Sequence, residues 1–212
     1  MLSQVAQGES QVHFRVHQFL ARENEAPDAM LYIQEGWACR YRLLSDGRRQ
    51  ITALYLPGDY CDPQWVLGGL TSQPIVAITN VRALRLPCKP PAYASMDGQQ
   101  GFWLSLSDMI ERQSAWLVTL GCMTAMERVA HLLVELFERM RKAGLAYGQQ
   151  CAMPLTQIEI ADMTGLTPVH VNRTLQSMRA KGLIELQSKW LRIPELHALR
   201  EAAAMTGQLS AI

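Results

Sequence analysis

The segment from residue 155 to 186 constrains the fold more than any other part of the chain, because it carries the start and stop signals of a helix pair. Thr156 and Glu159 have the spacing of a capping box, which marks the beginning of a helix. Gly165 stands where that helix must end, since a left-handed residue costs glycine almost nothing. The expected inward face of this helix comprises Ile158, Ala161 and Met163.

A second helix is predicted directly after the glycine. Thr167 can cap its N-terminus, and Pro168 falls in its first turn, where no backbone N–H is missed. Apolar residues then recur at helical spacing, which predicts an inward face of Val171, Leu175 and Met178. The outer side is left to Val169, His170, Asn172, Arg173 and Gln176.

The spacing within this pair favours a helix-turn-helix. A tight crossing needs a small residue, a turn glycine and a β-branched residue, and Ala161, Gly165 and Val171 meet these needs in order. Residues 181–186 then end the second helix and open a strand, and residues 187–193 turn back into another strand. This β-ribbon predicts a winged helix-turn-helix. An ordinary helical hairpin inside an all-α domain is the alternative.

Positive charge gathers on this motif, although the whole chain carries a formal net charge of only +1. Such a balance does not by itself suggest a nucleic-acid partner. Between Thr167 and Arg192, however, Glu185 is the single acidic residue. A solvated basic face is the alternative, but its coincidence with the motif favours contact with DNA phosphates. The five cations of this stretch are Arg173, Arg179, Lys181, Lys189 and Arg192.

The composition is that of a globular protein, with 49% hydrophobic and 18% charged residues among 212. The N-terminal residues lack the basic and apolar regions of a signal peptide. No run approaches the roughly 18 apolar residues of a membrane span. Five scattered cysteines suit reduced thiols better than a disulfide framework. We therefore expect a cytoplasmic protein.

The front half of the chain, from about Val12 to Pro87, alternates short apolar stretches with turn residues. Asp46-Gly47 is a strong hairpin signal, and Pro57-Gly58 ends another stretch. Many short strands at this spacing predict an antiparallel β-sandwich, barrel or jelly roll. Such folds often hold a ligand, but the fold alone does not establish one. The expected strands cover residues 31–33, 38–44, 50–56, 75–79 and 81–86.

A long helix is expected to join the two halves, because apolar residues recur every three or four positions from Leu106 to Met140 and stop before Gly144. A helix of about forty residues needs a partner along its length. That partner is either the chain's own β-domain or, as we expect, a second copy of the same helix. The predicted dimer seam includes Met109, Gln113, Trp116, Leu120 and Met123.

The chain is thus expected to be an α+β protein with three parts. Residues 1–103 form an antiparallel β-roll of jelly-roll type, residues 104–146 a long dimerisation helix, and residues 147–212 a winged helix-turn-helix. A two-fold dimer would present two recognition helices to half-sites about one turn of DNA apart.

Four stretches carry a resemblance to a known family. They are Gly36-Trp37-Ala38-Cys39-Arg40-Tyr41-Arg42, Leu56-Pro57-Gly58-Asp59, Glu127-Arg128-Val129-Ala130-His131-Leu132-Leu133 and the whole of 155–186. With the order of parts from about residue 12 to 195, they resemble the Crp/Fnr family of bacterial transcription regulators. Residues 167–176 are similar to a proteobacterial subgroup largely without an assigned ligand. The resemblance implies a cyclic-nucleotide-binding-like β-roll and makes RNA polymerase a candidate partner.

The departures from the family pattern concern the ligand. Relatives that bind cyclic AMP carry Gly-Glu-Leu after the Gly-Asp turn, with the glutamate on the ribose hydroxyl, and further on an arginine that pairs with the cyclic phosphate. Here these positions fall on Asp62-Pro63-Gln64 and near Pro74-Ile75. Without that cation a buried phosphate charge would be unpaired, which is costly. We therefore expect no cyclic nucleotide binding of physiological strength.

We also expect no cofactor and no metal. Iron–sulfur relatives carry a cluster of cysteines near the N-terminus, whereas the first cysteine here is Cys39. Haem-binding relatives use a histidine of the β-domain or its flank. His13 and His17 are the histidines before the long helix, and a structural or exposed role suits them better. No His/Cys pair has zinc spacing.

Two sensing roles of the β-roll stay open. Cys39, Cys61 and Cys88 could approach one another as a thiol sensor, although free cysteine is more often a small buried hydrophobe. Cys122 could lie near the dimer seam. A group of aromatic residues could line an apolar ligand pocket or fill the core, and we favour the core. These residues are Trp37, Tyr41, Tyr55, Tyr60 and Trp65.

Base readout is expected from the front half of the second helix, where this family often uses a Glu and an Arg four residues apart. Arg173 matches the arginine and can bond guanine O6 and N7. Val169 takes the glutamate position, where it can touch a thymine methyl but cannot accept a bond from cytosine. The DNA site should therefore differ from that of Glu-bearing relatives. Further expected contacts are Thr167 to a phosphate, Asn172 to adenine or a phosphate, secondary ones from His170 and Gln176, and phosphate contacts from Arg179, Lys181 and Lys189.

The sequence thus favours a homodimeric, sequence-specific DNA-binding transcription regulator, with an unidentified signal acting at the β-roll. The alternative is a ligand-binding or interaction module whose helix-turn-helix no longer binds DNA. An enzyme is disfavoured, because the chain carries no phosphate-binding P-loop, no Gly-x-Ser-x-Gly and no clustered carboxylates or metal ligands.

Overall fold

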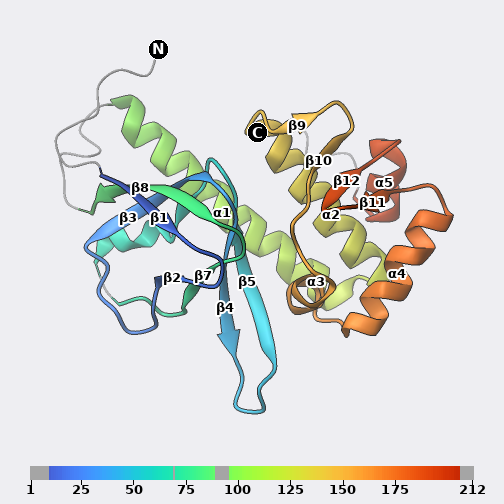
Figure 1. Cartoon of the computed structure of the whole chain (residues 1–212), viewed down its shortest axis with the longest axis horizontal. Helices are drawn as coiled ribbons and strands as arrows, with labels where there is room; N and C mark the ends of the chain where they lie inside the picture. The colour runs from blue at the N-terminus through green and yellow to red at the C-terminus, as the bar shows by residue number, and fades with distance from the viewer. Residues whose placement is uncertain (1–9, 69, 89–95, 206–212) are drawn as a thin grey trace. The chain divides into compact units, whose positions relative to one another are not determined.

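The computed structural model describes residues 10–68, 70–88 and 96–205. The chain divides into two compact units, one up to Gln113 and one from Ser114 onward. The first unit is built mainly of strands and the second mainly of helices (Figure 1). This is the α+β fold that the sequence predicts, whereas the three-part division at residues 103 and 146 stays a prediction.

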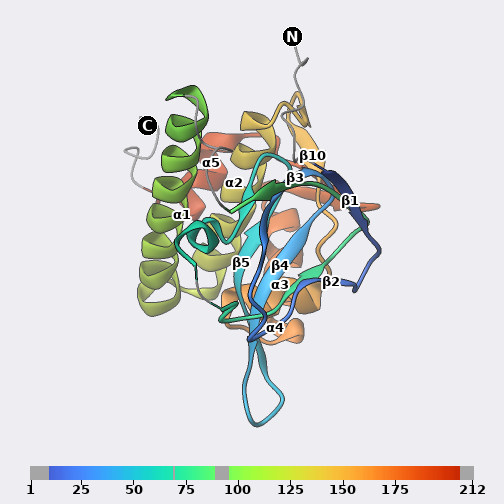
Figure 2. The same cartoon turned by 90° about the vertical axis from the view of Figure 1, so that its left-hand side faces the viewer.

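The first unit contains a β-roll made of two antiparallel sheets (Figure 2). Its elements are β1 (Ser10–Phe14), β2 (Phe19–Ala21), β3 (Ala29–Glu35), β4 (Ala38–Leu43), β5 (Arg49–Tyr55), β6 (Tyr60–Cys61), the 3-10 helix η1 (Pro63–Leu67), β7 (Ile75–Ala77) and β8 (Val81–Pro87). One sheet has the strand order β1-β8-β3-β6 and the other β2-β7-β4-β5. Both sheets pair early strands with late ones, so neither can form from a short piece of the chain.

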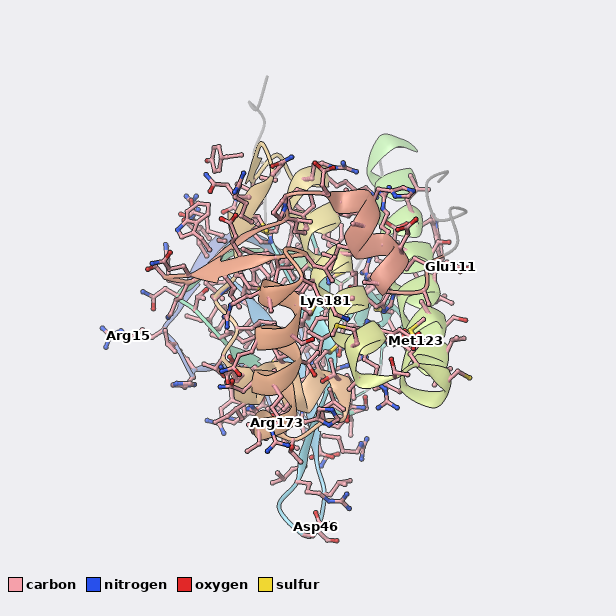
Figure 3. All side chains as sticks on the ribbon, turned by 90° about the vertical axis from the view of Figure 1, so that its right-hand side faces the viewer. Arg15, Asp46, Glu111, Met123, Arg173 and Lys181 are labelled. Atoms are coloured by element: carbon pink, nitrogen blue, oxygen red, sulfur yellow. The ribbon has the colours of Figure 1, made fainter. Side chains whose placement is uncertain are left out.

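The core of the roll lies between the inner faces of its sheets, where Ile33 and Ile75 are fully buried. Gly36 allows a close approach at the turn after β3, because a Cβ atom there would lie 2.0 Å from the carbonyl oxygen of Asn80. The hairpin between β4 and β5 turns at the expected Asp46-Gly47, with Asp46 at its tip in Figure 3. The side chains that fill the core include Leu31, Ile33, Ala38, Tyr55, Trp65, Ile75, Ala77, Val81 and Ala83.

The prediction of a single helix over residues 104–146 is wrong. The structure has two helices, α1 (Met96–Cys122) and α2 (Ala125–Lys142), separated at residues 123 and 124. Thr124 adopts an extended backbone and caps α2, and its side chain and that of Glu127 form a capping box. A residue with extended backbone cannot continue a helix, so this box ends the first helix as it begins the second.

The second unit is organised around α2. Helices α3, α4 and α5 and strand β10 all contact α2. The elements are β9 (Ala146–Tyr147), β10 (Gln150–Ala152), α3 (Gln157–Thr164), α4 (Pro168–Ala180), β11 (Glu185–Gln187), β12 (Trp190–Arg192) and α5 (Leu196–Ala202). The strands form one antiparallel sheet in the order β11-β12-β10-β9. The sequence predicted a two-stranded ribbon as the wing. In the structure these two strands, β11 and β12, are half of a four-stranded sheet.

One predicted inward residue of the first helix of the pair is misplaced. Ala161 and Met163 are buried as expected, but the Ile158 side chain is 58% exposed and Ile160 is buried in its place. Two residues turn an α-helix by about 200°, so Ile158 and Ile160 face opposite sides. Among the described residues, no helix is both long and apolar enough to cross a membrane.

Trp116 is also misplaced as a seam residue, because it is buried within its own unit. Its indole N–H donates to Glu135 at 2.7 Å, and its ring lies 5.2 Å from that of His131. The apolar residues that α1 leaves exposed are instead Trp103, Leu104, Ile110, Leu117 and Val118. A shift of one residue turns a helix by about 100°, which accounts for the difference between the predicted seam and this exposed stripe.

His131 is a buried polar residue at the centre of the second unit. The hydroxyl of Thr119 lies 2.9 Å from the carbonyl oxygen of Ala115 and shares a hydrogen bond of 2.9 Å with Nδ1 of His131. Burial lowers the pKa of His131 below its ordinary value of 6.5, against the raising effects of Glu135 and Glu138.

A lowered pKa makes the second unit sensitive to acid. The unfolded chain takes up a proton at His131 as the pH falls through 6.5, whereas the folded chain resists it. The contribution of neutral His131 to the free energy of unfolding is therefore complete above pH 6.5 and is lost as the pH falls below it. We expect His131→Asn to flatten the pH dependence of the melting temperature between about pH 7.5 and about pH 5. His170→Asn, which changes an exposed histidine of the same unit, should leave the slope unchanged; equal slopes for the wild type and His131→Asn would contradict the assignment.

Candidate nucleic-acid interface

The helix pair α3–α4 is fixed by the local signals that the sequence carries. Thr156 and Glu159 form both bonds of a capping box at the start of α3. Gly165 ends that helix in the left-handed region, at φ 66° and ψ 31°. Thr167 caps α4 by accepting the backbone N–H of His170 at 3.2 Å. These contacts set the direction of α4 before any DNA is bound.

The outer face of α4 presents Arg173 and Val169 to solvent. Val171, Leu175 and Met178 are buried, as predicted from their spacing. Arg173 is exposed and makes no hydrogen bond or ion pair with the described residues, and Val169 is 64% exposed. A guanidinium left free on an exposed helix face can form the paired bonds that guanine requires.

Asn172 is less available than the sequence suggests. Its side-chain N–H donates to the Oε1 atom of Gln157 at 3.1 Å, and it is only partly exposed. Gln157 is the first residue of α3, and it was not among the predicted site residues. The bond joins the first residue of α3 to the N-terminal half of α4. Gln157 therefore positions α4 through Asn172.

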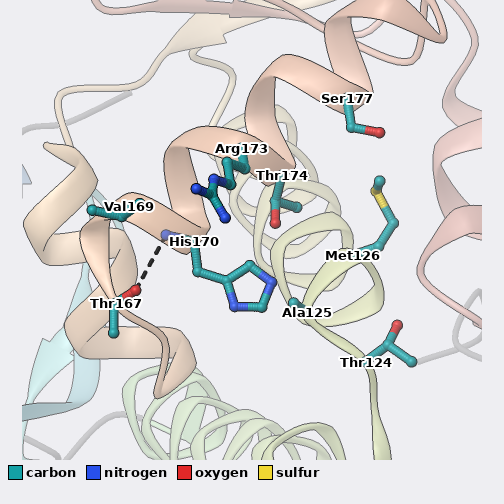
Figure 4. A pocket seen from close by; sticks show the side chains of 9 residues that line it. All are labelled: Thr124, Ala125, Met126, Thr167, Val169, His170, Arg173, Thr174 and Ser177. Atoms are coloured by element: carbon teal, nitrogen blue, oxygen red, sulfur yellow. Dashed lines mark hydrogen bonds between the residues drawn. The ribbon is translucent and has the colours of Figure 1, made fainter.

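A groove lies between the start of α2 and the start of α4 (Figure 4). It has a volume of about 660 Å³. In Figure 4 the imidazole of His170 points from α4 toward Ala125 at the start of α2. Two helix N-termini border this groove, and such ends favour anionic groups. The lining residues are Thr124, Ala125, Met126, Thr167, Val169, His170, Arg173, Thr174 and Ser177.

The predicted cations of the second unit differ in how far they are already engaged. Arg192 pairs with Glu185 at 2.6 Å across the wing, so its charge is compensated within the chain. Arg179 donates to the carbonyl of Leu186 at 3.3 Å and ties α4 to the wing. Arg173, Lys181 and Lys189 are exposed and make no ion pair with the described residues; Figure 3 labels the first two, at the front and the end of α4.

The wing turns through the two residues Ser188 and Lys189, which both have positive φ. Gln187 and Trp190 pair on either side of them, so this is a two-residue hairpin. Positive φ at both positions is the conformation that matches the twist of paired strands. The turn thereby fixes Lys189 at the tip of the wing.

Arg128 is a further structural residue that the helical spacing did not reveal. Its Nε donates to the carbonyl of Met123 at 2.8 Å, and its Nη1 donates to the carbonyl of Thr164 at 3.2 Å. These carbonyls lie at the ends of α1 and α3, where backbone groups lack helical partners. One side chain on α2 thus fastens the ends of two helices.

Three of the five aromatic residues singled out in the roll belong to its core. Trp37, Tyr55 and Trp65 are buried, and Tyr41 and Tyr60 are half-buried. His13 and His17 are both exposed. No cluster of three potential metal ligands occurs among the described residues.

The five cysteines differ from one another in burial and in the pKa of the thiol. Cys39, Cys61 and Cys151 are buried. Burial, reinforced by the charge of Asp62, raises the pKa of Cys61 well above its ordinary value, and burial raises the pKa of Cys151 to about 11. Burial also raises the pKa of Cys88. A thiol must ionise to react, so Cys61, Cys88 and Cys151 are poorly placed as thiolate sensors. Cys39 is shielded by burial, and Cys122 is the exposed cysteine.

Comparison with known families divides the chain in the same way. Residues 127–202 match the profile of the Crp-like helix-turn-helix domain. Residues 11–89 match that of the cyclic nucleotide-binding domain. Both matches agree with the units seen in the structure.

Curated relatives are regulators. The chain is 31% identical to the nitrogen fixation regulation protein FixK of Rhizobium meliloti over 179 residues, covering 84% of this chain and 80% of that protein. It is 28% identical to the transcriptional activatory protein AadR of Rhodopseudomonas palustris, covering 86% of this chain and 76% of that protein. Among solved structures, FixK2 from Bradyrhizobium japonicum superposes with a TM-score of 0.80 at 25% identity, covering 92% of this chain and 96% of that one.

The difference in exposure predicts how the thiols react. A disulfide reagent at neutral pH should modify Cys122 in a fast phase, because the other four cysteines are buried or partly buried. Cys122→Ser should remove the fast phase, and Cys88→Ser should leave it intact. A fast phase that survives in Cys122→Ser would show that a buried thiol opens to solvent. The measurement is the time course of thiol modification in the native protein.

Proposed function

This chain belongs to the Crp/Fnr family of DNA-binding transcription regulators, and we propose that it binds as a homodimer to a pseudo-palindromic DNA site through α4. The observation that carries the proposal is the outer face of α4, where Arg173 and Val169 are exposed and the cap of Thr167 holds the helix start. Arg173 would read a guanine, and Val169 would contact a thymine methyl.

Phosphate contacts would surround this reading face. Lys181 and Lys189 stand at the end of α4 and the tip of the wing and are free to meet the DNA backbone. Thr167 and the groove between the starts of α2 and α4 would take a further phosphate. Gln176 and His170 would be secondary contacts, and Arg179 would serve through the wing that it holds.

The dimer would form along α1 with a seam different from the one predicted. Trp103, Ile110 and Leu117 recur every seven residues and are all exposed. A repeat of seven keeps one side of a helix facing a partner helix. Gln113 is exposed and Met109, Leu120 and Met123 are partly exposed, so they would flank this stripe.

The protein would act in the cytoplasm, with RNA polymerase as its partner at a promoter. Its named relatives include a transcriptional activatory protein, and the β-roll would modulate the two DNA-binding units by shifting an equilibrium between existing states. Transcription from a promoter that carries the selected site, with and without the protein, would decide whether the polymerase responds.

Selection of binding sites from random double-stranded DNA, with no ligand added, tests the proposal directly. Enrichment of a two-fold symmetric motif is the expected result, and it would also reveal the base that faces Val169. Failure to enrich any motif, both alone and with a cell extract of small metabolites, would refute the DNA-binding assignment. Enrichment of an asymmetric single half-site would refute the dimer instead.

Arg173→Ala should weaken binding to the selected site by about 1–3 kcal/mol per half-site, because one pair of base contacts is lost in each half-site. Binding to random DNA should change much less. Arg192→Ala is the matched control, since Arg192 already pairs with Glu185, and it should change both affinities little. Both affinities are measured by titration at fixed salt. An equal loss on specific and random DNA would make Arg173 a phosphate contact.

Leu117→Glu should shift the protein from dimer to monomer, because it places a charge on the apolar stripe of α1, where Leu117 is 76% exposed. Leu43→Glu is the control, since Leu43 is similarly exposed on the hairpin of the roll. Sedimentation velocity measures the mass of each variant. A Leu117→Glu protein that remains dimeric would place the interface elsewhere.

A further inference from the structure

Arg40 and Asp62 form an ion pair inside the β-roll. The Nη1 atom of Arg40 lies 2.5 Å from the Oδ1 atom of Asp62, and their side chains are 8% and 0% exposed. The hydroxyl of Tyr55, itself buried, donates to the same carboxylate oxygen. Two donors from neighbouring strands, β4 and β5, thus converge on one carboxylate from the segment between β6 and η1.

The rest of the guanidinium is held by a chain of polar side chains. The Nε atom of Arg40 donates to the hydroxyl of Thr52 at 3.3 Å. That hydroxyl donates in turn to the Oε1 atom of Gln73 at 2.6 Å. Arg40 therefore joins the segment before η1, the strand β5 and the loop that leads to β7.

Asp62 adopts a left-handed backbone conformation. Its φ is 41° and its ψ 66°, a region that few residues other than glycine occupy and that aspartate tolerates better than most. The same backbone turns its carboxylate inward, directly before Pro63 starts η1. Burying this charge without Arg40 would cost more, because an unpaired charge in the interior loses its hydration.

The protonation states agree with this arrangement. Burial, together with the charge of Asp62, raises the pKa of Tyr55 well above 10, so its hydroxyl keeps the proton that it donates. Burial works to lower the pKa of Arg40, but the charge of Asp62 and the hydrogen bond to its carboxylate raise that pKa. The Oδ2 atom of Asp62 has no hydrogen-bond partner among the described residues. The carboxylate is therefore bound through one oxygen only.

We propose that the β-roll carries its own anionic ligand: the carboxylate of Asp62 occupies an anion site formed by Arg40 and Tyr55 and holds the start of η1 in place. A roll of this kind needs no small anion from outside to fix η1. The site itself is a carboxylate site, and it would accept a free carboxylate once the built-in one is removed. This inference concerns the roll alone and does not rest on the proposed DNA binding.

Chemical rescue tests the proposal on the full chain. Asp62→Ala removes the carboxylate and leaves Arg40 unpaired in a space the size of a small acid, so the melting temperature should fall by about 6–20 °C. Sodium formate should restore several degrees more than sodium chloride at the same ionic strength. The rescue should rise with formate concentration and reach a plateau, as expected for one binding site.

Three variants serve as controls. Asp62→Asn keeps the volume and loses the charge, so it should be destabilised but not rescued. Asp62→Ala combined with Arg40→Met lacks the cation and should lose the rescue. Asp46→Ala removes the partner of Arg48 in an exposed pair of the same unit and should respond to the two salts as the wild type does.

The proposal is overturned if Asp62→Ala melts within the error of the wild type, or if formate and chloride act alike on it. Equal rescue in the variant that also lacks Arg40 would overturn it as well, because the anion would then bind elsewhere. Where Asp62→Ala does not fold in chloride, the soluble yield on refolding in formate against chloride replaces the melting temperature. Equal yields would count against the site.

Discussion

The packing of α4 against α2 is the constraint on which the proposed DNA-binding surface depends. Val171, Leu175 and Met178 bury one face of α4 and leave the opposite face exposed for the proposed contact with DNA. Buried side chains in a close-packed interior permit little rotation, so the angle at which Arg173 is presented follows from this contact. Arg128, bonded to the ends of α1 and α3, keeps α2 in register with both neighbours. A reader of DNA needs such rigidity, because misplacing a bidentate side chain loses its base contacts.

The break between α1 and α2 gives the second unit an additional helix N-terminus. A continuous helix would engage the backbone N–H groups of residues 125 and 126 in its own hydrogen bonds. Because Thr124 starts a new helix, a helix N-terminus borders the groove beside His170 and Thr167. The interruption thereby adds a second anion-favouring end beside that of α4. It also separates the apolar stripe of α1 from the buried face of α2, so that one helix can serve an interface while the other serves a core.

Local signals in the sequence predicted most of the second unit, and non-local contacts explain what they missed. Both ends of α3 and the start of α4 follow from residues within a few positions of each other. The box at Thr124 and Glu127 has the same form, yet the continuous apolar spacing across it suggested one helix. The spacing of apolar residues alone could not show which face of α1 is exposed, because Trp116 is buried against residues of the next helix, such as Glu135. The partnership of Arg40 with Asp62 depends on a fold that brings β4 to the segment after β6, which no local pattern encodes.

The cationic side chains of the chain fall into two groups, those that pair with an acidic side chain in the fold and those that do not. Arg40 is neutralised inside the roll, Arg192 on the wing, and Arg200 by Glu138 at 3.0 Å from its Nε atom. Arg173, Lys181 and Lys189 have no such acidic partner among the described residues. A net charge near zero therefore coexists with a local cationic surface, because acidic side chains form ion pairs with other arginines of the fold. Affinity for DNA should depend on these few free cations, and its salt dependence should reflect their number per dimer more than the composition of the whole chain.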